Sequence, residues 1–285
     1  MVDILAQRGH DVRVLSRKPA AAVRGLPAGA MAVSGHFDDP ASLARASEGI
    51  DAVSFMVPAF LESPDKALQY IDTAMRAAAA GGARLIVWNT GGRFPEEGGA
   101  RVLDKAMLDQ WRALQASGLP LISIAPTTYM ENLLGPGPYK AIRLRDEVAY
   151  PVLASRKMGW IAARDVSAFV VAALERPQFA GRVFRVSGPQ GLTGPELAQA
   201  FADVLGRTLR FRTLTPDEMR RELEDAYGAG AGDEVAEEYR LDQIDPHPPA
   251  KYYEMGAVLR DLPIEMTSIR SWIAQHAAAF TPLAG

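Results

Sequence analysis

The first twenty residues, "MVDILAQRGHDVRVLSRKPA" (1–20), decide the interpretation of the fold. Residues 2–8 have the apolar spacing of a short helix, and Gly9 is a typical helix stop. Residues 12–16, "VRVLS", have the composition of a strand, and a basic pair follows directly. A helix that leads into a strand with charges at its carboxyl end is typical of the second half of a βαβ unit.

The same alternation of strand and helix continues through the first half of the chain. The strand candidates are near-continuous apolar runs, as expected for strands that are covered on both faces. They lie at residues 30–35, 51–57, 84–90 and 120–126, with helical patterns between them at 40–48, 62–80 and 101–117. Strands joined by helices predict right-handed crossovers, and therefore an α/β fold with a doubly wound parallel sheet of Rossmann type.

The pattern becomes looser after residue 127. Residues 129–160 contain three prolines and predict a loop-rich excursion, and a buried helix (161–177) and a strand (182–187) follow. The remainder predicts a smaller, mostly helical lobe with a flexible joint at 226–234 and helices at 195–206, 215–227, 233–242 and 267–279. We therefore expect two parts, a Rossmann domain whose first strand is missing and a substrate or partner lobe, at residues 1–127 plus 156–180 and residues 128–155 plus 181–285.

Composition excludes several classes of protein. With 285 residues and 48% hydrophobic residues, the chain is long enough to bury a large core. A net charge of −3 gives no electrostatic reason to expect a nucleic acid or a membrane surface as partner. The sequence has no cysteine, and its four histidines lack the spacing of metal ligands. No apolar run approaches the about 18 residues of a membrane span, so we expect a soluble, cytoplasmic protein without a metal.

A glycine motif stands far from the N-terminus. Residues 186–201, "VSGPQGLTGPELAQAF", contain a G-x-x-G-x-x-G pattern between a predicted strand and a predicted helix. However, Thr193 and Glu196 form the T-x-x-E pattern of a capping box, and prolines 189 and 195 remove two N–H donors that a phosphate loop would use. We therefore interpret this motif as a turn and a helix cap.

The end of the first strand offers a better cofactor site. In dinucleotide-binding folds an acid at this place favours NAD, whereas basic residues accommodate the 2′-phosphate of NADP. Ser16, Arg17 and Lys18 occupy it here, which favours NADP(H) over NAD(H); the alternative is that both cations are solvated loop charges. The glycine-rich loop should lie about 20 residues earlier, so we expect the upstream coding sequence to continue in frame into a strand and a glycine-rich turn.

Five segments, in this order and spacing, resemble the NmrA-like family of atypical short-chain dehydrogenases/reductases. They are "VRVLSRKP" (12–19), "SGHFDDPASLARASEGIDAVSFMVP" (34–58), "SGLPLISIAPTTYMENLL" (117–134), "IAARDVSAFVVAAL" (161–174) and "FRVSGPQGLTGPELAQAFADVLGR" (184–207). The resemblance covers nearly the whole chain. It implies a Rossmann-type domain that binds NAD(P), and it assigns the misplaced glycines to the substrate lobe.

The resemblance and the sheet edge together predict a site. Ligands of open α/β sheets bind at the carboxyl ends of the strands, which favours Asn89, Thr90 and Gly91, although these residues also suit a plain loop turn. The resemblance implies that further residues bind the cofactor, namely Phe37, Asp38 (near the adenine), Met56, Val57, Pro58, Lys105, Pro126 and Thr127. Weaker candidates for the substrate pocket are Trp88, Tyr129 and Asn132.

Two residues are candidates for catalysis. Lys105 matches the family's helix lysine, which the resemblance places at the nicotinamide ribose; alternatively it is a surface lysine paired with Asp109 at i, i+4. Family members with full reductase chemistry carry a tyrosine four residues earlier, where this chain has Arg101. Tyr129 could donate the proton instead, or simply pack. We expect Asp165 to cap a helix rather than to act in catalysis.

Three functions remain open. The first is an NADPH-dependent oxidoreductase of small carbonyl or quinone substrates. The second is a non-catalytic NADP(H) sensor that acts through a protein partner, which the absence of a tyrosine at position 101 favours. The third is a truncated product that is unable to bind dinucleotide.

Overall fold

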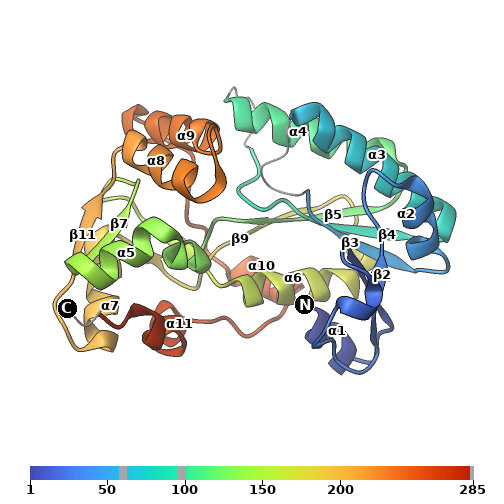
Figure 1. The fold of residues 1–285 in the computed structure, drawn as a ribbon, viewed down its shortest axis with the longest axis horizontal. Coiled ribbons are helices and arrows are strands. Elements are labelled where there is room, and N and C mark those ends of the chain that lie inside the picture. The colour runs from blue at the N-terminus through green and yellow to red at the C-terminus, as the bar shows by residue number, and fades with distance from the viewer. Residues whose placement is uncertain (58–62, 96–100, 283–285) are drawn as a thin grey trace.

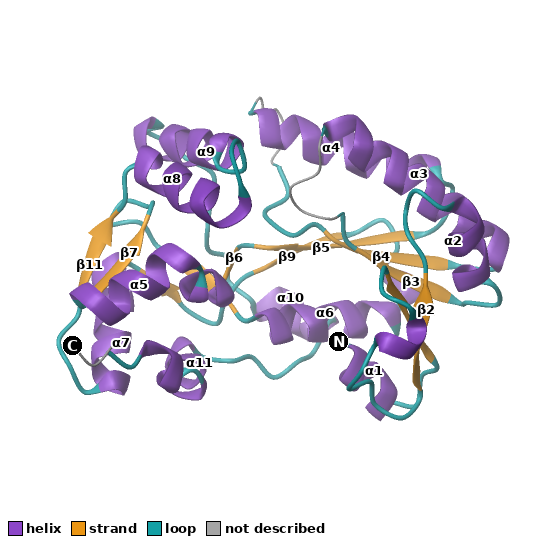
Figure 2. Cartoon of the chain, viewed as in Figure 1, coloured by secondary structure: helices purple, strands orange, loops and turns teal. Residues whose placement is uncertain are grey.

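The computed structural model describes residues 1–57, 63–95 and 101–282. Figure 1 and Figure 2 show an α/β domain whose sheet is covered by helices on both faces, beside a second lobe that is mostly helical. The predicted fold class is confirmed. Within the described ranges, no helix combines the length and the apolar character needed to cross a membrane.

The central sheet consists of four parallel strands in the order β3-β4-β5-β9. Their bounds are Ala52–Phe55, Leu85–Asn89, Leu121–Pro126 and Val183–Val186. β4 and β5 are buried along almost their whole length, which explains why both read as continuous apolar runs. Every strand predicted in the first half of the chain is confirmed within two residues at each end.

The first two strands form a separate parallel pair. β1 (Val12–Ser16) follows α1 (Val2–Gln7) and pairs with β2 (Ala30–Ser34). Among the described residues, β1 pairs only with β2 and β3 only with β4, so both strands keep one unpaired edge. The expected upstream strand concerns residues outside this chain and stays a prediction.

Helices cover the two faces of the sheet in separate layers. α2, α3 and α4 lie on one face, and α6, α10 and α1 lie on the other (Figure 1). The bounds not yet given are Pro40–Ser47 for α2, Pro64–Gly81 for α3, Val102–Ala116 for α4, Ala163–Leu174 for α6 and Gly256–Asp261 for α10. α2 begins where the Asp39 carboxylate accepts a hydrogen bond from the N–H of Ser42 at 3.1 Å. α3 is followed directly by Gly82, whose φ of +103° suits a glycine.

The second lobe is built on short strands and on helices from both halves of the chain. β11 pairs in parallel with β7, and β8 lies between β10 and β6. These strands span Glu147–Tyr150 (β7), Arg210–Thr213 (β11), Met158–Ile161 (β8), Gly191–Leu192 (β10) and Thr128–Tyr129 (β6). The helices span Pro136–Arg145 (α5), Gly194–Leu205 (α7), Pro216–Tyr227 (α8), Asp233–Ile244 (α9) and Ile269–Gln275 (α11), and 3₁₀ turns lie at Ala20–Ala22, Met130–Leu134, Pro177–Phe179 and Ala277–Phe280.

The prediction of a loop-rich segment at 129–160 is wrong. Residues 136–145 form α5, and β7 and β8 are buried strands. The prolines misled the prediction because Pro136 and Pro138 lie in the first turn of α5, where the backbone N–H groups have no intrahelical partner.

The segment predicted as a flexible joint, residues 226–234, is a tight turn between the packed helices α8 and α9. Gly232 approaches the backbone of Arg220 so closely that a Cβ would lie 2.6 Å from its carbonyl oxygen.

Asp165 does not cap its helix as predicted. The residue before α6 is Ala162, which provides no side-chain cap, and the first N–H of the helix donates instead to the Glu131 carboxylate at 3.0 Å. Asp165 accepts hydrogen bonds from the N–H and the hydroxyl of Thr267, at 2.6 and 2.8 Å. Both carboxylates therefore fasten α6 to segments of the second lobe.

Candidate functional site

Polar groups meet where β4 and β5 end. Asn89 is the last residue of β4, and Tyr129 lies just beyond β5. The amide nitrogen of Asn89 lies 3.2 Å from the Tyr129 hydroxyl oxygen, and the amide oxygen of Asn89 accepts from the N–H of Gly91 at 3.0 Å. Gly91 has a φ of +72°, so it makes the sharp turn that this contact requires. The predicted Asn89–Gly91 and Tyr129 are therefore brought together at the carboxyl edge.

Tyr129 remains a protonated phenol at neutral pH. Burial raises the pKa of its hydroxyl above the usual value and outweighs the hydrogen bond from Asn89 that lowers it. A neutral phenol held by an amide at the edge of a sheet is able to donate a proton to a neighbouring oxygen.

The predicted cofactor loop follows β1. The Ser16 hydroxyl accepts from the N–H of Lys18 at 3.1 Å, so the loop turns tightly over the strand end. Arg17 and Lys18 are exposed, and within the part of the chain that the structure describes neither forms an ion pair with a carboxylate. Two uncompensated cations at this place fit an anionic group of a ligand, such as a 2′-phosphate.

Asp38 lies in the loop that follows the neighbouring strand β2, where an ion pair fixes its carboxylate. Lys66 is 2.5 Å from one carboxylate oxygen, and the Tyr70 hydroxyl donates to the other at 2.8 Å. Hydrogen bonds from Lys66 and Tyr70 lower the pKa of Asp38 below its usual value. Phe37 packs against the rings of Phe55 and Tyr70, which places it in the wall beneath this strand end.

The remaining predicted cofactor contacts lie along the same edge. Met56 follows β3 and is exposed, Val57 is partly buried, and Pro58 lies outside the described residues. Pro126 ends β5, and the Thr127 hydroxyl donates to the carbonyl oxygen of Gly159 in the second lobe. This edge of the sheet is therefore joined directly to the second lobe.

Trp88 and Lys105 do not reach this edge in the structure. Trp88 has no exposed surface, because its ring lies in the core beneath α4, against Phe94; its assignment to the substrate pocket is therefore corrected. Lys105 is exposed on α4, and its ammonium lies 2.6 Å from the Asp109 carboxylate. This is the i, i+4 surface pair that the sequence analysis gave as the alternative to a contact with the nicotinamide ribose.

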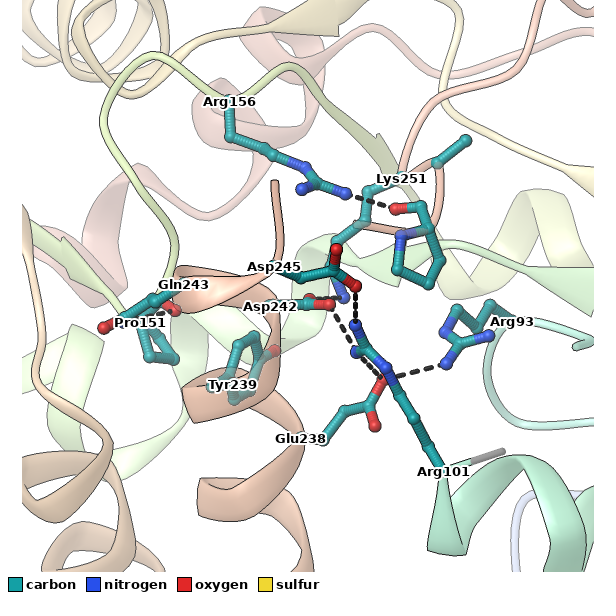
Figure 3. A network of polar contacts seen from close by, with 12 residues as sticks. Arg93, Arg101, Pro151, Arg156, Glu238, Tyr239, Asp242, Gln243, Asp245 and Lys251 are labelled. Atoms are coloured by element: carbon teal, nitrogen blue, oxygen red, sulfur yellow. Dashed lines mark hydrogen bonds and ion pairs between the residues drawn. The ribbon is translucent and has the colours of Figure 1, made fainter. Parts of the chain in front are cut away.

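The sequence did not predict a network of charges between α4 and α9 (Figure 3). Arg101, at the N-terminus of α4, pairs with Glu238 at 3.0 Å, Asp242 at 2.7 Å and Asp245 at 3.0 Å. Arg93 pairs with Glu238 at 2.9 Å, and it also binds Asp104 of α4 at 2.7 Å. The network therefore fastens the sheet domain to the second lobe beside the end of β4.

Lys251 completes this network from the far end of the chain. Its ammonium is 2.5 Å from Asp242, and its side chain is 12% exposed. Burial lowers the pKa of Lys251 and outweighs the attraction of Asp242, which acts in the opposite direction. The one sequence signal for this network is the run of six acids in residues 233–245, which contains a single base, Arg240.

The glycine motif at 188–194 has a packing role. A Cβ on Gly188 would lie 1.8 Å from the Trp160 carbonyl oxygen, and one on Gly194 would lie 2.3 Å from the Phe211 ring. Thr193 and Glu196 form the predicted capping box at the start of α7. The interpretation as a turn and a helix cap is confirmed.

A separate asparagine–tyrosine chain lies in the second lobe. The amide nitrogen of Asn132 donates to the Tyr150 hydroxyl at 3.1 Å, and the Tyr239 hydroxyl lies 3.0 Å from the same oxygen. Burial raises the pKa of Tyr150, so this phenol stays neutral. Asn132 is therefore tied to a polar chain that ends at Tyr239, beside Lys251.

A parallel α/β sheet with polar side chains gathered at its carboxyl edge is the architecture of dinucleotide-binding proteins. The chain belongs to the NmrA-like family, whose sequence profile matches residues 1–254. This result confirms the resemblance on which the site residues were predicted.

Comparison with individual proteins gives relatives along nearly the whole chain. The (4-alkanoyl-5-oxo-2,5-dihydrofuran-3-yl)methyl phosphate reductase of Streptomyces griseus is 32% identical, over 98% of this chain and 93% of the relative. An NAD(P)H azoreductase of Xenophilus azovorans is 29% identical, over 78% of this chain and 75% of the relative. Among solved structures, an NADPH-dependent quinone oxidoreductase of Escherichia coli in complex with NADPH has a TM-score of 0.74 at 14% identity, over 97% and 95% of the two chains.

Proposed function

We propose that the chain is an NAD(P)H-dependent oxidoreductase that reduces small electrophiles, namely carbonyl compounds, quinones or activated alkenes. The observation that carries this proposal is the meeting of Asn89 and Tyr129 at the carboxyl edge of the central sheet. Two relatives that cover most of the chain are named as reductases, one of an unsaturated lactone that carries a phosphate and one an azoreductase.

The residues at the strand ends fit a bound dinucleotide with a 2′-phosphate. Arg17 and Lys18 would hold that phosphate, because both are exposed cations without a carboxylate partner in the described ranges. Asp38 and Phe37 would border the adenosine, and Asn89, Thr90 and Thr127 would face the nicotinamide end. We therefore propose that NADP(H) is preferred over NAD(H).

When bound, a reduced nicotinamide supplies a hydride to an electrophilic carbon. The chain supplies position and a proton. Tyr129 donates its phenolic proton to the oxygen on which negative charge develops, and Asn89 holds the phenol in place through the 3.2 Å contact. Lys105 would contact the nicotinamide ribose only after it leaves Asp109, since the two side chains are paired here.

The test is the oxidation of NADPH by the purified protein with a panel of quinones, aldehydes and enones, followed by absorbance. We expect turnover with at least one class and a lower KM for NADPH than for NADH. NADPH binding without turnover on every class would overturn the reductase assignment and favour the sensor. The absence of any thermal shift with millimolar NADPH would reject dinucleotide binding by this chain.

A further inference from the structure

The sheet domain meets the second lobe in two places, on opposite faces of the central sheet. On one face, the buried Asp165 of α6 accepts two hydrogen bonds from Thr267. On the same side, Glu131 accepts from the N–H of Ala163 and from the indole N–H of the buried Trp272, and the chain passes from β8 into α6. On the other face, α4 meets α9 through the charge network (Figure 3). The contact at α6 is therefore continuous with the backbone, whereas α4 and α9 lie far apart along the chain.

The contact between α4 and α9 is polar. Arg101, Glu238 and Asp242 are largely buried in it, whereas the apolar side chains Val102 and Ile244, on the same two helices, are 65% and 64% exposed. In the described ranges, no hydrophobic cluster contains side chains from both helices. Opposite charges that separate into water regain hydration, which offsets much of the attraction that they lose. The contact between α4 and α9 should therefore open more easily than the contact at α6.

The network also holds the segment that follows β4. This segment carries the Asn89–Gly91 turn of the proposed reaction site, and Arg93 lies directly beyond that turn. The guanidinium of Arg93 is 2.9 Å from Glu238 of α9 and 2.7 Å from Asp104 of α4. The position of the segment therefore depends on whether α9 lies against α4.

We propose that these charges form a latch between the two lobes, made by the ion pairs of Arg93 and Arg101 with the α9 acid Glu238 and of Arg101 with Asp242 and Asp245. When the latch opens, α9 moves away from α4 while the contacts at α6 hold, and a ligand enters or leaves the carboxyl edge of the sheet. When it closes, the segment after β4 is fixed. The movement is a property of the chain itself, and its effect on a dinucleotide rests on the proposed function.

Distances between spin labels on α4 and α9 test the latch directly. The chain has no cysteine, so Gln115→Cys and Glu234→Cys, both at exposed positions outside the network, place one label on each helix. We expect one narrow distance in the labelled parent protein. With Arg101→Gln, the population of a longer distance should rise by at least about tenfold. Asp245→Asn, which removes one partly exposed partner of Arg101, should give an intermediate rise and keeps the test decisive if Arg101→Gln does not fold.

Two controls separate opening of the latch from a general loss of structure. Labels at Gln115→Cys and Ala79→Cys lie on α4 and α3 within the sheet domain, and their distance should stay narrow in Arg101→Gln. Arg76→Gln is the matched charge control, because Arg76 is 80% exposed and pairs only with Asp72 in the described ranges; it should change neither distance. An unchanged distance between α4 and α9 in Arg101→Gln, or equal broadening for both label pairs, would overturn the latch.

The kinetics of NADPH binding separate the latch from the proposed function. In stopped-flow fluorescence, Arg101→Gln should raise the association and dissociation rate constants together by about threefold or more, with a smaller change in Kd. If NADPH does not bind, the proposed function fails, while the label distances still decide the latch. If NADPH binds and is turned over, but both rate constants equal those of the wild type, the latch does not control access to the site and the proposal is wrong.

Discussion

Arg101 should contribute more to stability than any surface arginine of this chain. Its guanidinium is 12% exposed and faces Glu238 and Asp242, which are 13% and 5% exposed. Although burial alone would lower the pKa of Arg101, Asp242 and Glu238 raise it above the usual value. Removal of one partner from a buried pair costs about 3–5 kcal/mol when the other charge is left alone.

The expected loss of stability is smaller for Arg101, because Glu238 and Asp242 each keep a second cation when Arg101 is replaced. Glu238 retains Arg93 at 2.9 Å, and Asp242 retains Lys251 at 2.5 Å. We therefore expect Arg101→Gln to lower the free energy of unfolding by about 2–3 kcal/mol. For a domain of this size, the loss corresponds to a fall in Tm of about 4–12 °C.

Urea unfolding of the single and double variants measures this contribution. In a cycle with Glu238→Gln, we expect a coupling energy of about 1 kcal/mol or more, because the two side chains are in direct contact at 3.0 Å. Arg76→Gln is the control and should change stability by less than about 0.5 kcal/mol. A loss of that small size for Arg101→Gln, with no coupling to Glu238, would show that the network does not hold α9 against α4.

Three further predictions concern the cofactor loop, the proton donor and a helix cap. Arg17→Gln should raise KM for NADPH by about tenfold to 100-fold in steady-state kinetics; an equal rise for NADH would contradict contact with the 2′-phosphate. Tyr129→Phe should lower kcat by about 100-fold without a matching change in KM, and an unchanged kcat would exclude it as the proton donor. Glu218 caps α8 through Thr215 and pairs with Arg212, and these contacts lower its pKa to about 2. Because the folded pKa lies below the unfolded one, its stabilisation is present above about pH 4.5 and is lost as the pH falls toward about 2. Glu218→Gln should therefore cost about 1–2 kcal/mol at pH 7 and little at pH 2 in denaturant unfolding.

The sequence predicts those parts of the fold whose signals are local. The strands β4 and β5 are buried on both faces, so a continuous apolar run identifies each of them. The capping box at Thr193 is equally local, since its two side chains lie three residues apart. Prolines carry an ambiguous signal, because the same residue breaks a helix interior and starts a helix, as at Pro136 in α5.

The candidate site could be predicted only in part, because most of its contacts join residues that lie far apart in the sequence. Asn89 could be predicted because ligands of parallel sheets bind at the carboxyl ends of the strands. Tyr129 was only a weaker candidate, and its contact with Asn89 appears in the structure alone. The partners of Arg101 are 137 to 144 residues away along the chain, and no local pattern links them. The guanidinium of Arg156 likewise donates a hydrogen bond to the carbonyl oxygen of Pro249, which is 93 residues away. Such contacts follow from the packing of the lobes, which periodicity does not encode.

Because position 101 holds an arginine, the proton that a reduction requires must come from another residue. The family resemblance implies a tyrosine at this position in members with full reductase chemistry, and a tyrosine can give up a phenolic proton. A guanidinium keeps its proton at every physiological pH, and Asp242 and Glu238 hold this one more firmly still. Arg101 therefore cannot replace the tyrosine as an acid. If the chain is a reductase, Tyr129 is the phenol best placed to supply the proton, because it is held by Asn89 at the carboxyl edge where the substrate would lie.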